Sequence, residues 1–154
     1  MTAEHHDEVV ALNLASEELT APMDHARLVW MVSMCEIADV ALIDGQVAGF
    51  VTVFGPGTDY DSRHYAWFRE RYEPPFWYLD RIVVDERRRR SGVASAIYQS
   101  VETRASAAGV PVLLEVNLEP ANDPSLLFHR RRGYRGVGEF QSKPDLRVMM
   151  FEYP

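Results

Sequence analysis

RRRRSGVA, residues 87–94, places four arginines directly before a run of small residues. The preceding segment 76–84, FWYLDRIVV, is apolar enough to be a buried strand, and residues 92–108 have the spacing of a helix. The first N–H groups of a helix have no partner within it, and the helix dipole adds partial positive charge there. Gly92 lets the backbone approach an anion closely. The pattern therefore predicts a turn that binds phosphate groups.

The composition favours a single globular domain that binds a discrete anion. The chain has 154 residues, of which 47% are hydrophobic, enough to form one buried core. Its formal net charge is −7, yet arginines cluster at 87–90 and at 130–132. Nucleic-acid binders usually carry a broad basic face, so we expect no nucleic-acid partner. The alternative for each cluster is a run of solvated surface charge.

Cysteine use and hydropathy favour a cytoplasmic protein. Cys35 is the only cysteine, which excludes an internal disulfide, and its place in an apolar helical segment predicts buried filler rather than a nucleophile. The polar, acidic residues 1–8 do not suit a signal peptide. No apolar run approaches the roughly 20 residues that span a bilayer, so we expect no membrane partner. His5 and His6 are weak evidence for metal, and CxxC and HExxH patterns are lacking, so we expect no metal site.

The remaining patterns predict an α/β fold with a mostly antiparallel sheet. Asp44-Gly45 between two apolar runs is a strong hairpin signal. The strand–helix–strand segment 76–117 predicts one right-handed crossover, which makes its two strands parallel. The expected elements are strands at 8–14, 38–43, 46–54, 76–84, 112–117, 134–141 and 146–153, and helices at 22–35, 92–108 and 125–132.

Two motifs of this chain resemble those of the GNAT superfamily of acyl-CoA-dependent N-acetyltransferases. That family carries Arg/Gln-x-x-Gly-x-Gly/Ala directly after its fourth strand, and residues 89–94 read RRSGVA. It also carries an asparagine, then a short helix that ends in an aromatic pair and Gly-Phe/Tyr, and residues 122–134 read NDPSLLFHRRRGY. The order of elements along the whole chain fits as well. The strings YDS, YAWF, LDRIVV and EVN are most similar to a bacterial subgroup of predicted acetyltransferases.

The resemblance implies one GNAT domain over residues 1–154, with a mixed sheet of six or seven strands flanked by helices. The fourth and fifth strands would splay apart to form a cleft for acetyl-CoA, the implied cofactor. Its pyrophosphate would be bound mainly by backbone N–H groups, with charge-assisted bonds from arginines. The implied cofactor-binding residues are Ile82, Val83, Val84, Arg88, Arg89, Arg90, Ser91, Gly92, Val93, Ala94, Ser95, Asn117, Asn122, Ser125 and Phe128. For Asn122 the alternative is a helix cap.

The family reaction implies candidates for proton transfer. A neutral amine attacks the thioester directly, so an ammonium must lose a proton, an oxyanion must be stabilised and a thiolate must be protonated. Asp80 is the first candidate for the base and Glu115 the second. The alternatives are that Asp80 pairs with an arginine such as Arg81, and that Glu115 joins a network with Asn117. His129 stands where the family often has a tyrosine proton donor, and the alternative is that it packs beside the cofactor.

The segment 55–75, GPGTDYDSRHYAWFRERYEPP, is rich in turn formers and aromatic residues and lies between two convincing strands. A long irregular segment inside a compact domain is usually a lid or a binding loop. We expect it to line the acceptor pocket, where aromatic rings would form a cage for an apolar or cationic amine. The expected contacts in this segment are Tyr60, Asp61, Tyr65, Trp67 and Tyr72, and Tyr78 of the following strand is a further one. The alternatives are a satellite core that anchors the segment and a dimer contact.

The sequence therefore predicts a cytoplasmic, acetyl-CoA-dependent N-acetyltransferase that acts on a primary amine of a small molecule or peptide. The alternative is an inactive acyl-CoA-binding sensor or interaction module on the same fold. The convergence of Asp80, Glu115 and His129 on the expected reaction centre favours the enzyme. An RNA-binding module would need an exposed aromatic strand motif that this chain lacks. Family members are often dimers, although no feature of this sequence demands a homodimer.

Overall fold

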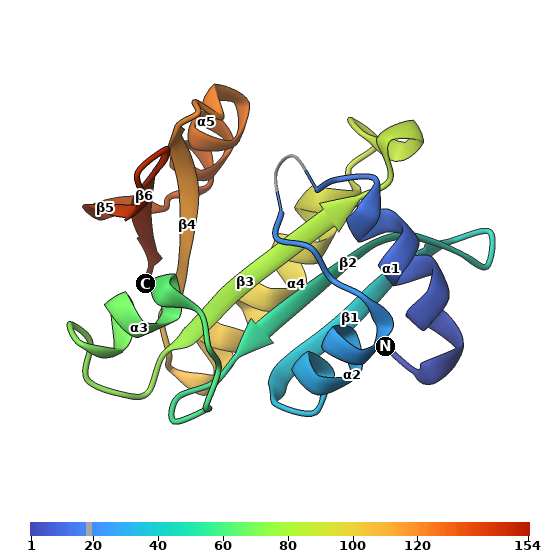
Figure 1. Ribbon diagram of the computed structural model, residues 1–154, viewed down its shortest axis with the longest axis horizontal. Coiled ribbons are helices and arrows are strands. Elements are labelled where there is room, and N and C mark those ends of the chain that lie inside the picture. Colours follow the sequence, from blue (N-terminus) through green and yellow to red (C-terminus); the bar gives the residue numbers. More distant parts are fainter. Residues whose placement is uncertain (18–19) are drawn as a thin grey trace. The chain divides into compact units, whose positions relative to one another are not determined.

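The computed structural model describes residues 1–17 and 20–154. Its helices are α1 (His6–Leu14), α2 (His25–Val32), α3 (Arg63–Arg69), α4 (Val93–Ala108) and α5 (Asp123–Arg132). Its strands are β1 (Cys35–Ile43), β2 (Gln46–Phe54), β3 (Trp77–Val84), β4 (Val112–Glu119), β5 (Arg135–Lys143) and β6 (Leu146–Tyr153). In this described part of the chain the strands form a six-stranded mixed sheet in the order β1-β2-β3-β4-β6-β5 (Figure 1). The predicted α/β class is confirmed, and none of these helices has the length and apolar character needed to cross a membrane.

The first compact unit comprises Met1–Phe54 and Leu79–Thr103. Its strands β1 and β2 form an antiparallel hairpin, which confirms the predicted pairing. The hairpin turns at Asp44 and Gly45, whose φ angles of 52° and 77° lie in the left-handed region. Figure 1 shows α1 in front of these strands and α4 behind them, so helices cover both faces of this part of the sheet.

A close approach of α4 to β2 positions the arginine turn. A Cβ at Gly49 would lie 2.8 Å from the Val83 carbonyl oxygen and 3.3 Å from the Val93 side chain. Only a residue without a side chain fits this contact. The turn is tied to the same strand because Asp85 donates its N–H to the Ala48 carbonyl at 2.9 Å. Strand β2 therefore fixes both the end of β3 and the start of α4.

The strand predicted at 8–14 is wrong, because this segment belongs to helix α1. The buried residues of α1 are His6, Val9 and Asn13, and their spacing is that of one helix face rather than of alternating strand positions. Glu8 accepts the Val47 N–H at 3.0 Å, which ties α1 to β2. The two adjacent valines suggested a strand, but the tertiary contact of a single helix face decides the structure.

Cys35 begins β1 rather than lying in a helix as predicted, because α2 ends at Val32. Burial, together with the nearby Asp80 carboxylate, raises the pKa of its thiol to about 12. A thiol with so high a pKa forms almost no thiolate near neutrality. Cys35 is thus a half-buried, protonated thiol at the start of β1, as expected of a residue that fills space rather than of a nucleophile.

The second compact unit comprises Gly55–Tyr78 and Arg104–Pro154. In it β6 lies between β4 and β5 and is antiparallel to both. The start of β3 pairs in parallel with β4 through Trp77 and Tyr78, which confirms the predicted parallel crossover. Helix α5 contacts β4, and α3 contacts both β4 and β5.

The insert 55–75, predicted to be mostly irregular, contains the helix α3. Ser62 caps α3 by accepting the Tyr65 N–H at 3.3 Å. The side chains of Tyr65 and Phe68 are fully buried, and the Tyr65 hydroxyl donates to the Gly55 carbonyl at 2.8 Å. The insert is therefore packed into the core of the second unit.

Candidate active site

The arginine turn joins β3 to α4 in the first unit. Asp85 caps a short 3-10 helix and pairs with the Arg87 guanidinium at 2.7 Å. The hydrogen bonds from Arg87 hold the pKa of the Asp85 carboxyl below its usual value and raise the pKa of Arg87. Arg89 lies 3.6 Å from Glu86, a looser ion pair at the surface. Arg87 is thus occupied by Asp85, and the predicted phosphate contacts are the three arginines that follow it.

Gly92 ends the turn in a conformation that leaves room for an anion. Its φ is +89°, and within the described residues no heavy atom beyond its chain neighbours lies within 4 Å of the place of a Cβ. Arg90 also has a positive φ, of 61°. Helical bonding in α4 begins with the Ala96 N–H, which donates to the Gly92 carbonyl at 2.9 Å. The N–H groups of residues 93–95 belong to the first turn, which helices leave for outside partners, so the turn suits a phosphate group.

The other predicted cofactor contacts of the first unit lie on β3, in the arginine turn and at the start of α4, and they differ in exposure. On β3, Val83 is buried while Ile82 and Val84 are half-buried, as expected of a strand. Around the turn, the exposed residues are Arg89, Arg90, Ser91, Gly92 and Ser95, the half-buried ones are Arg88 and Ala94, and Val93 is buried. The small and basic side chains of the turn therefore face solvent, where a ligand can reach them.

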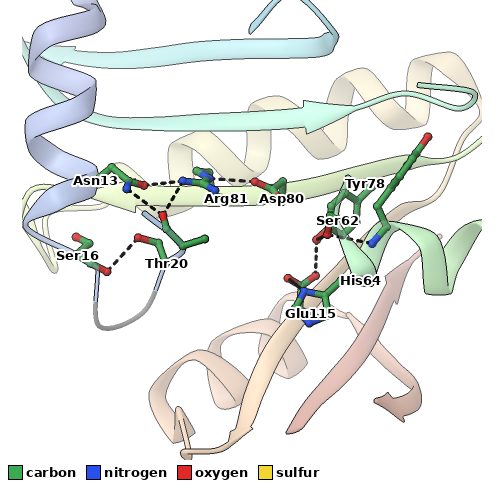
Figure 2. A network of polar contacts seen from close by, with 11 residues as sticks. Asn13, Ser16, Thr20, Ser62, His64, Tyr78, Asp80, Arg81 and Glu115 are labelled. Atoms are coloured by element: carbon green, nitrogen blue, oxygen red, sulfur yellow. Dashed lines mark hydrogen bonds and ion pairs between the residues drawn. The ribbon is translucent and has the colours of Figure 1, made fainter. Parts of the chain in front are cut away.

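Asp80 and Arg81 form a buried ion pair in the first unit (Figure 2). Arg81 Nε lies 3.0 Å from Asp80 Oδ2, and the two side chains are only 6% and 9% exposed. Arg81 Nη1 also donates to Asn13 Oδ1 at 2.8 Å and to the Ala21 carbonyl at 3.2 Å. Buried charges are tolerated in proteins when they are paired in this way. The geometry matches the alternative in which Asp80 pairs with Arg81, and its role as the base stays a prediction.

The Glu115 carboxylate of β4 is held by two donors in the second unit (Figure 2). The Tyr78 hydroxyl donates to Oε2 at 2.9 Å, and His64 Nδ1 lies 2.9 Å from Oε1. The Tyr78 side chain is fully buried, and the side chains of His64 and Glu115 are 19% and 14% exposed. Ser62 Oγ lies 3.5 Å from the Tyr78 hydroxyl and extends the network. Glu115 is therefore a carboxylate largely removed from water, with partners other than the predicted Asn117.

His64 is a candidate functional residue that the sequence analysis missed. The aromatic residues of the insert suggested a ligand cage, and this histidine between them carried no motif of its own. A local signal was present, because Ser62 is a favoured N-cap residue and predicts a helix that starts one residue before His64. Its pairing with Glu115 depends on how α3 packs against β4, which the local sequence does not specify.

His129 lies inside an aromatic cluster of the second unit. It is only 4% exposed, its ring stacks on Phe151 with centroids 5.8 Å apart, and Tyr134 and Phe128 meet it edge-on. Nδ1 lies 2.7 Å from the Ser125 carbonyl oxygen, which can only accept a hydrogen bond, so this nitrogen carries a proton. This environment agrees with the alternative that His129 serves in packing, and proton donation by His129 stays a prediction.

Replacing His129 with phenylalanine tests that prediction. We expect turnover to fall about tenfold or more, because the new ring has no nitrogen to move a proton, while it still packs on Phe151. Affinity for acetyl-CoA should be nearly unchanged. Initial rates and an acetyl-CoA titration on one preparation measure both quantities. Unchanged turnover would remove His129 from the reaction, and a lower melting temperature with lower turnover would assign it to packing.

Asn122 caps α5 in the second unit. Its Oδ1 accepts the Ser125 N–H at 3.3 Å, and its own N–H donates to the Asn117 carbonyl at 3.1 Å. Phe128 lies on the same helix, with the Arg132 guanidinium over its ring at 5.6 Å. Asn122 therefore acts as a helix cap, which was the alternative to cofactor binding. The cofactor contacts assigned to these residues stay predictions.

Three of the predicted acceptor contacts, Tyr60, Tyr65 and Tyr78, belong to the packed core. Tyr60 and Tyr65 are 6% and 0% exposed, and their rings lie 6.1 Å apart, as in the satellite core given as an alternative. Trp67 is half-buried against β5, where a Cβ at Gly138 would lie 3.0 Å from the indole. The Arg71 guanidinium lies over the indole, 4.3 Å from the ring centroid.

Trp67→Ala separates acceptor binding from packing. If the indole contacts the acceptor, the KM for the amine should rise several-fold, since burying an aromatic ring contributes about 1–3 kcal/mol, and the melting temperature should change little. Steady-state kinetics and thermal unfolding of the same sample measure both. An unchanged KM with a lower melting temperature would make Trp67 part of the packing between α3 and β5.

The family profile described as "Acetyltransferase (GNAT) family" matches residues 7–134. The chain belongs to the GNAT acetyltransferase family. This GNAT protein is thus an acetyl-CoA-dependent acetyltransferase, and acetyl-CoA is its expected cofactor. Comparison with curated protein sequences gives no match.

Solved structures are similar to this GNAT chain in fold at low sequence identity. Ard1 from Thermoplasma volcanium is 20% identical, with 98% of this chain and 92% of that one covered and a TM-score of 0.77. Naa20 from Chaetomium thermophilum, in complex with a bisubstrate analogue, is 17% identical, with 100% of this chain and 84% of that one covered and a TM-score of 0.79. NAA60 from Arabidopsis thaliana, in complex with acetyl-CoA, is 19% identical, with 99% of this chain and 94% of that one covered and a TM-score of 0.72. These similarities establish the fold, in agreement with the predicted GNAT architecture.

Proposed function

We propose that this acetyltransferase transfers an acetyl group from acetyl-CoA to a primary amine of a small molecule or peptide, by direct attack of the amine. The observation that carries the proposal is the Glu115 carboxylate, which is nearly buried and held by Tyr78 and His64 in a chain of this family. A carboxylate in such a place is positioned to accept a proton during catalysis. We assign Glu115 as the base and place Asp80, the first candidate from the sequence, second, because Asp80 is paired with a guanidinium whereas the partners of Glu115 are a hydroxyl and an imidazole.

The arginine turn supports acetyl-CoA as the donor. The open space at Gly92 and the first-turn N–H groups of α4 fit a pyrophosphate. Arg88, Arg89 and Arg90 would hold the phosphates, and the backbone of residues 82–84 would hold the amides of the pantetheine arm. When bound, acetyl-CoA supplies the acetyl group as a thioester.

The remaining steps fall to side chains of the second unit. Glu115 takes a proton from the acceptor ammonium, and the Tyr78 hydroxyl fixes the orientation of this carboxylate by donating to Oε2. His129 is the proposed donor of the proton that the leaving coenzyme A thiolate takes up; because Nδ1 donates to the Ser125 carbonyl, the transferred proton would come from Nε2 of the protonated imidazole. The three roles are separable because each residue can be replaced by one of similar shape without the titrating group.

The insert supports an acceptor of moderate size. It lines a cavity of about 510 Å³ in the second unit, a volume typical of small-ligand sites. The walls carry the carboxylate of Asp59 and the guanidinium of Arg69 beside the aromatic rings of Tyr72 and Phe76. Tyr72 is itself fixed, because its hydroxyl donates to Glu152 Oε2 at 2.8 Å. A primary amine that also carries an apolar or acidic group suits this lining.

Thermal unfolding with added ligand tests the donor. Acetyl-CoA and coenzyme A at about a hundredfold excess over Kd should each stabilise the protein by about 2.7 kcal/mol, whereas inorganic phosphate should not. An equal shift with phosphate, or no shift, would make the arginine turn a surface anion patch.

Release of coenzyme A thiol tests the acceptor. The panel consists of benzylamine, spermidine, kanamycin and a tetrapeptide with a free α-amine, which span apolar, cationic, sugar and peptide amines. Thiol release that depends on one of these amines supports the proposed function. Acetyl-CoA binding without release from any of them would favour the inactive acyl-CoA-binding module.

A further inference from the structure

The insert helix α3 is fixed to β5 at two successive residues. The His64 imidazole meets the Phe140 ring edge-on, with centroids 5.9 Å apart. Arg63 places its guanidinium 5.7 Å from the centroid of the same ring and donates to the Ser142 carbonyl. These contacts leave the imidazole in one orientation, with Nδ1 directed at Glu115. The position of His64 is therefore set by the packing of the insert rather than by its own flexible side chain.

The contact atoms define how His64 acts on Glu115. Because a carboxylate oxygen accepts from Nδ1, this nitrogen carries a proton in both the neutral and the protonated imidazole. The titratable or charged groups of this cluster include Glu115 from β4, Tyr78 from β3 and Arg63 from α3, while β5 contributes the Phe140 ring. Neutral His64 leaves the carboxylate with its negative charge. Protonated His64 cancels that charge across a 2.9 Å contact.

We propose that His64 is a positioning residue of the acetyl-transfer centre and that its charge switches Glu115 between a resting and an active state. The proposal rests on the proposed function, in which Glu115 is the base. With neutral His64, Glu115 attracts the acceptor ammonium and takes its proton: an N–H bond breaks, an Oε–H bond forms, and the amine keeps the electron pair. With protonated His64, the ion pair weakens both the attraction and the basicity of the carboxylate.

The direction of the pH dependence follows from these charges. Imidazole is the side chain whose charge changes closest to neutral pH. On the acidic side of this change His64 is protonated and Glu115 is neutralised, so acceptor binding and kcat/KM are low. On the alkaline side the imidazole is neutral and both rise. The enzyme should therefore lose activity on mild acidification, before its surface carboxylates are protonated.

Two substitutions separate the hydrogen bond from the charge. In His64→Asn the side-chain amide can take the place of Nδ1 as a donor to Glu115 but does not titrate. We expect its kcat/KM to stay within about threefold of the wild-type value at high pH, because the amide keeps the hydrogen bond to Glu115, and to lose the acidic limb. His64→Leu fills the space beside Phe140 without a donor, and at high pH its kcat should fall about tenfold or more below that of the wild type. The probe is the amine of the four-member panel with the highest kcat/KM.

Binding of the same amine without acetyl-CoA gives a second readout. By calorimetry, the wild type should bind it more tightly above the imidazole range than below it, and His64→Asn should show no such change. His25→Asn, which removes an exposed histidine of α2, is the matched control and should behave as wild type. An acidic limb that persists in His64→Asn overturns the proposal while the proposed function stands. A wild type that acetylates no amine of the panel contradicts the proposed function itself, and this inference with it.

Discussion

Replacing Glu115 with glutamine is expected to lower kcat about a hundredfold or more, because the reaction loses its proton acceptor. Glutamine has nearly the same shape, and its amide oxygen can still accept the Tyr78 hydroxyl that Glu115 Oε2 accepts in the structure. The fold should therefore be retained. The thermal shift with acetyl-CoA should also be retained, because the predicted phosphate contacts lie in the arginine turn and not at Glu115. Thiol-release kinetics and thermal unfolding of the same variant measure the two effects.

Asp80→Asn is the matched comparison, since it removes the other candidate carboxylate. Its main effect should be on stability, because it leaves the buried Arg81 guanidinium without its charged partner, at a cost of about 3 kcal/mol. Its kcat should change far less than that of Glu115→Gln. A hundredfold loss of kcat in Asp80→Asn, with nearly normal turnover in Glu115→Gln, would reverse the assignment of the base.

Local signals were enough to predict the parts of the fold that lead to the cofactor turn. The Asp44-Gly45 pair needs positive φ at both residues, and the structure has 52° and 77° there. The helix after Gly92 and the parallel pairing of β3 with β4 followed from periodicity and from the handedness rule. The turn and the helix depend on residues adjacent in sequence, and the parallel pairing follows from the connectivity of one strand–helix–strand segment.

The prediction that was wrong and the site residue that was missed both depend on tertiary contacts. The segment 8–14 has no local preference strong enough to decide between helix and strand, and the burial of one face of α1 decides it. The pairing of His64 with Glu115 joins a helix of the insert to β4, and no spacing in the sequence encodes it. The ion pair of Asp80 with Arg81 could be considered from the sequence because the two residues are adjacent.

Gly92→Val is expected to abolish the thermal shift that acetyl-CoA produces, which corresponds to at least about a hundredfold weaker binding. At a φ of +89° a β-branched residue is strained by about 1–3 kcal/mol, and the turn relieves that strain only by leaving its present conformation. The new side chain also occupies the open space beside the first-turn N–H groups of α4. A titration of melting temperature against acetyl-CoA concentration measures the loss.

Gly109→Val controls for the strain itself. Gly109 follows the other end of α4 with a φ of +69°, and it too has no heavy atom of the described residues, chain neighbours aside, within 4 Å of a Cβ position. Both variants should therefore lose similar stability without ligand, and each shift is measured from the variant's own melting temperature. A shift lost in Gly92→Val but kept in Gly109→Val locates phosphate binding at the N-terminus of α4. A wild-type shift in both would mean that the cofactor is held elsewhere and that the four arginines are solvated surface charge.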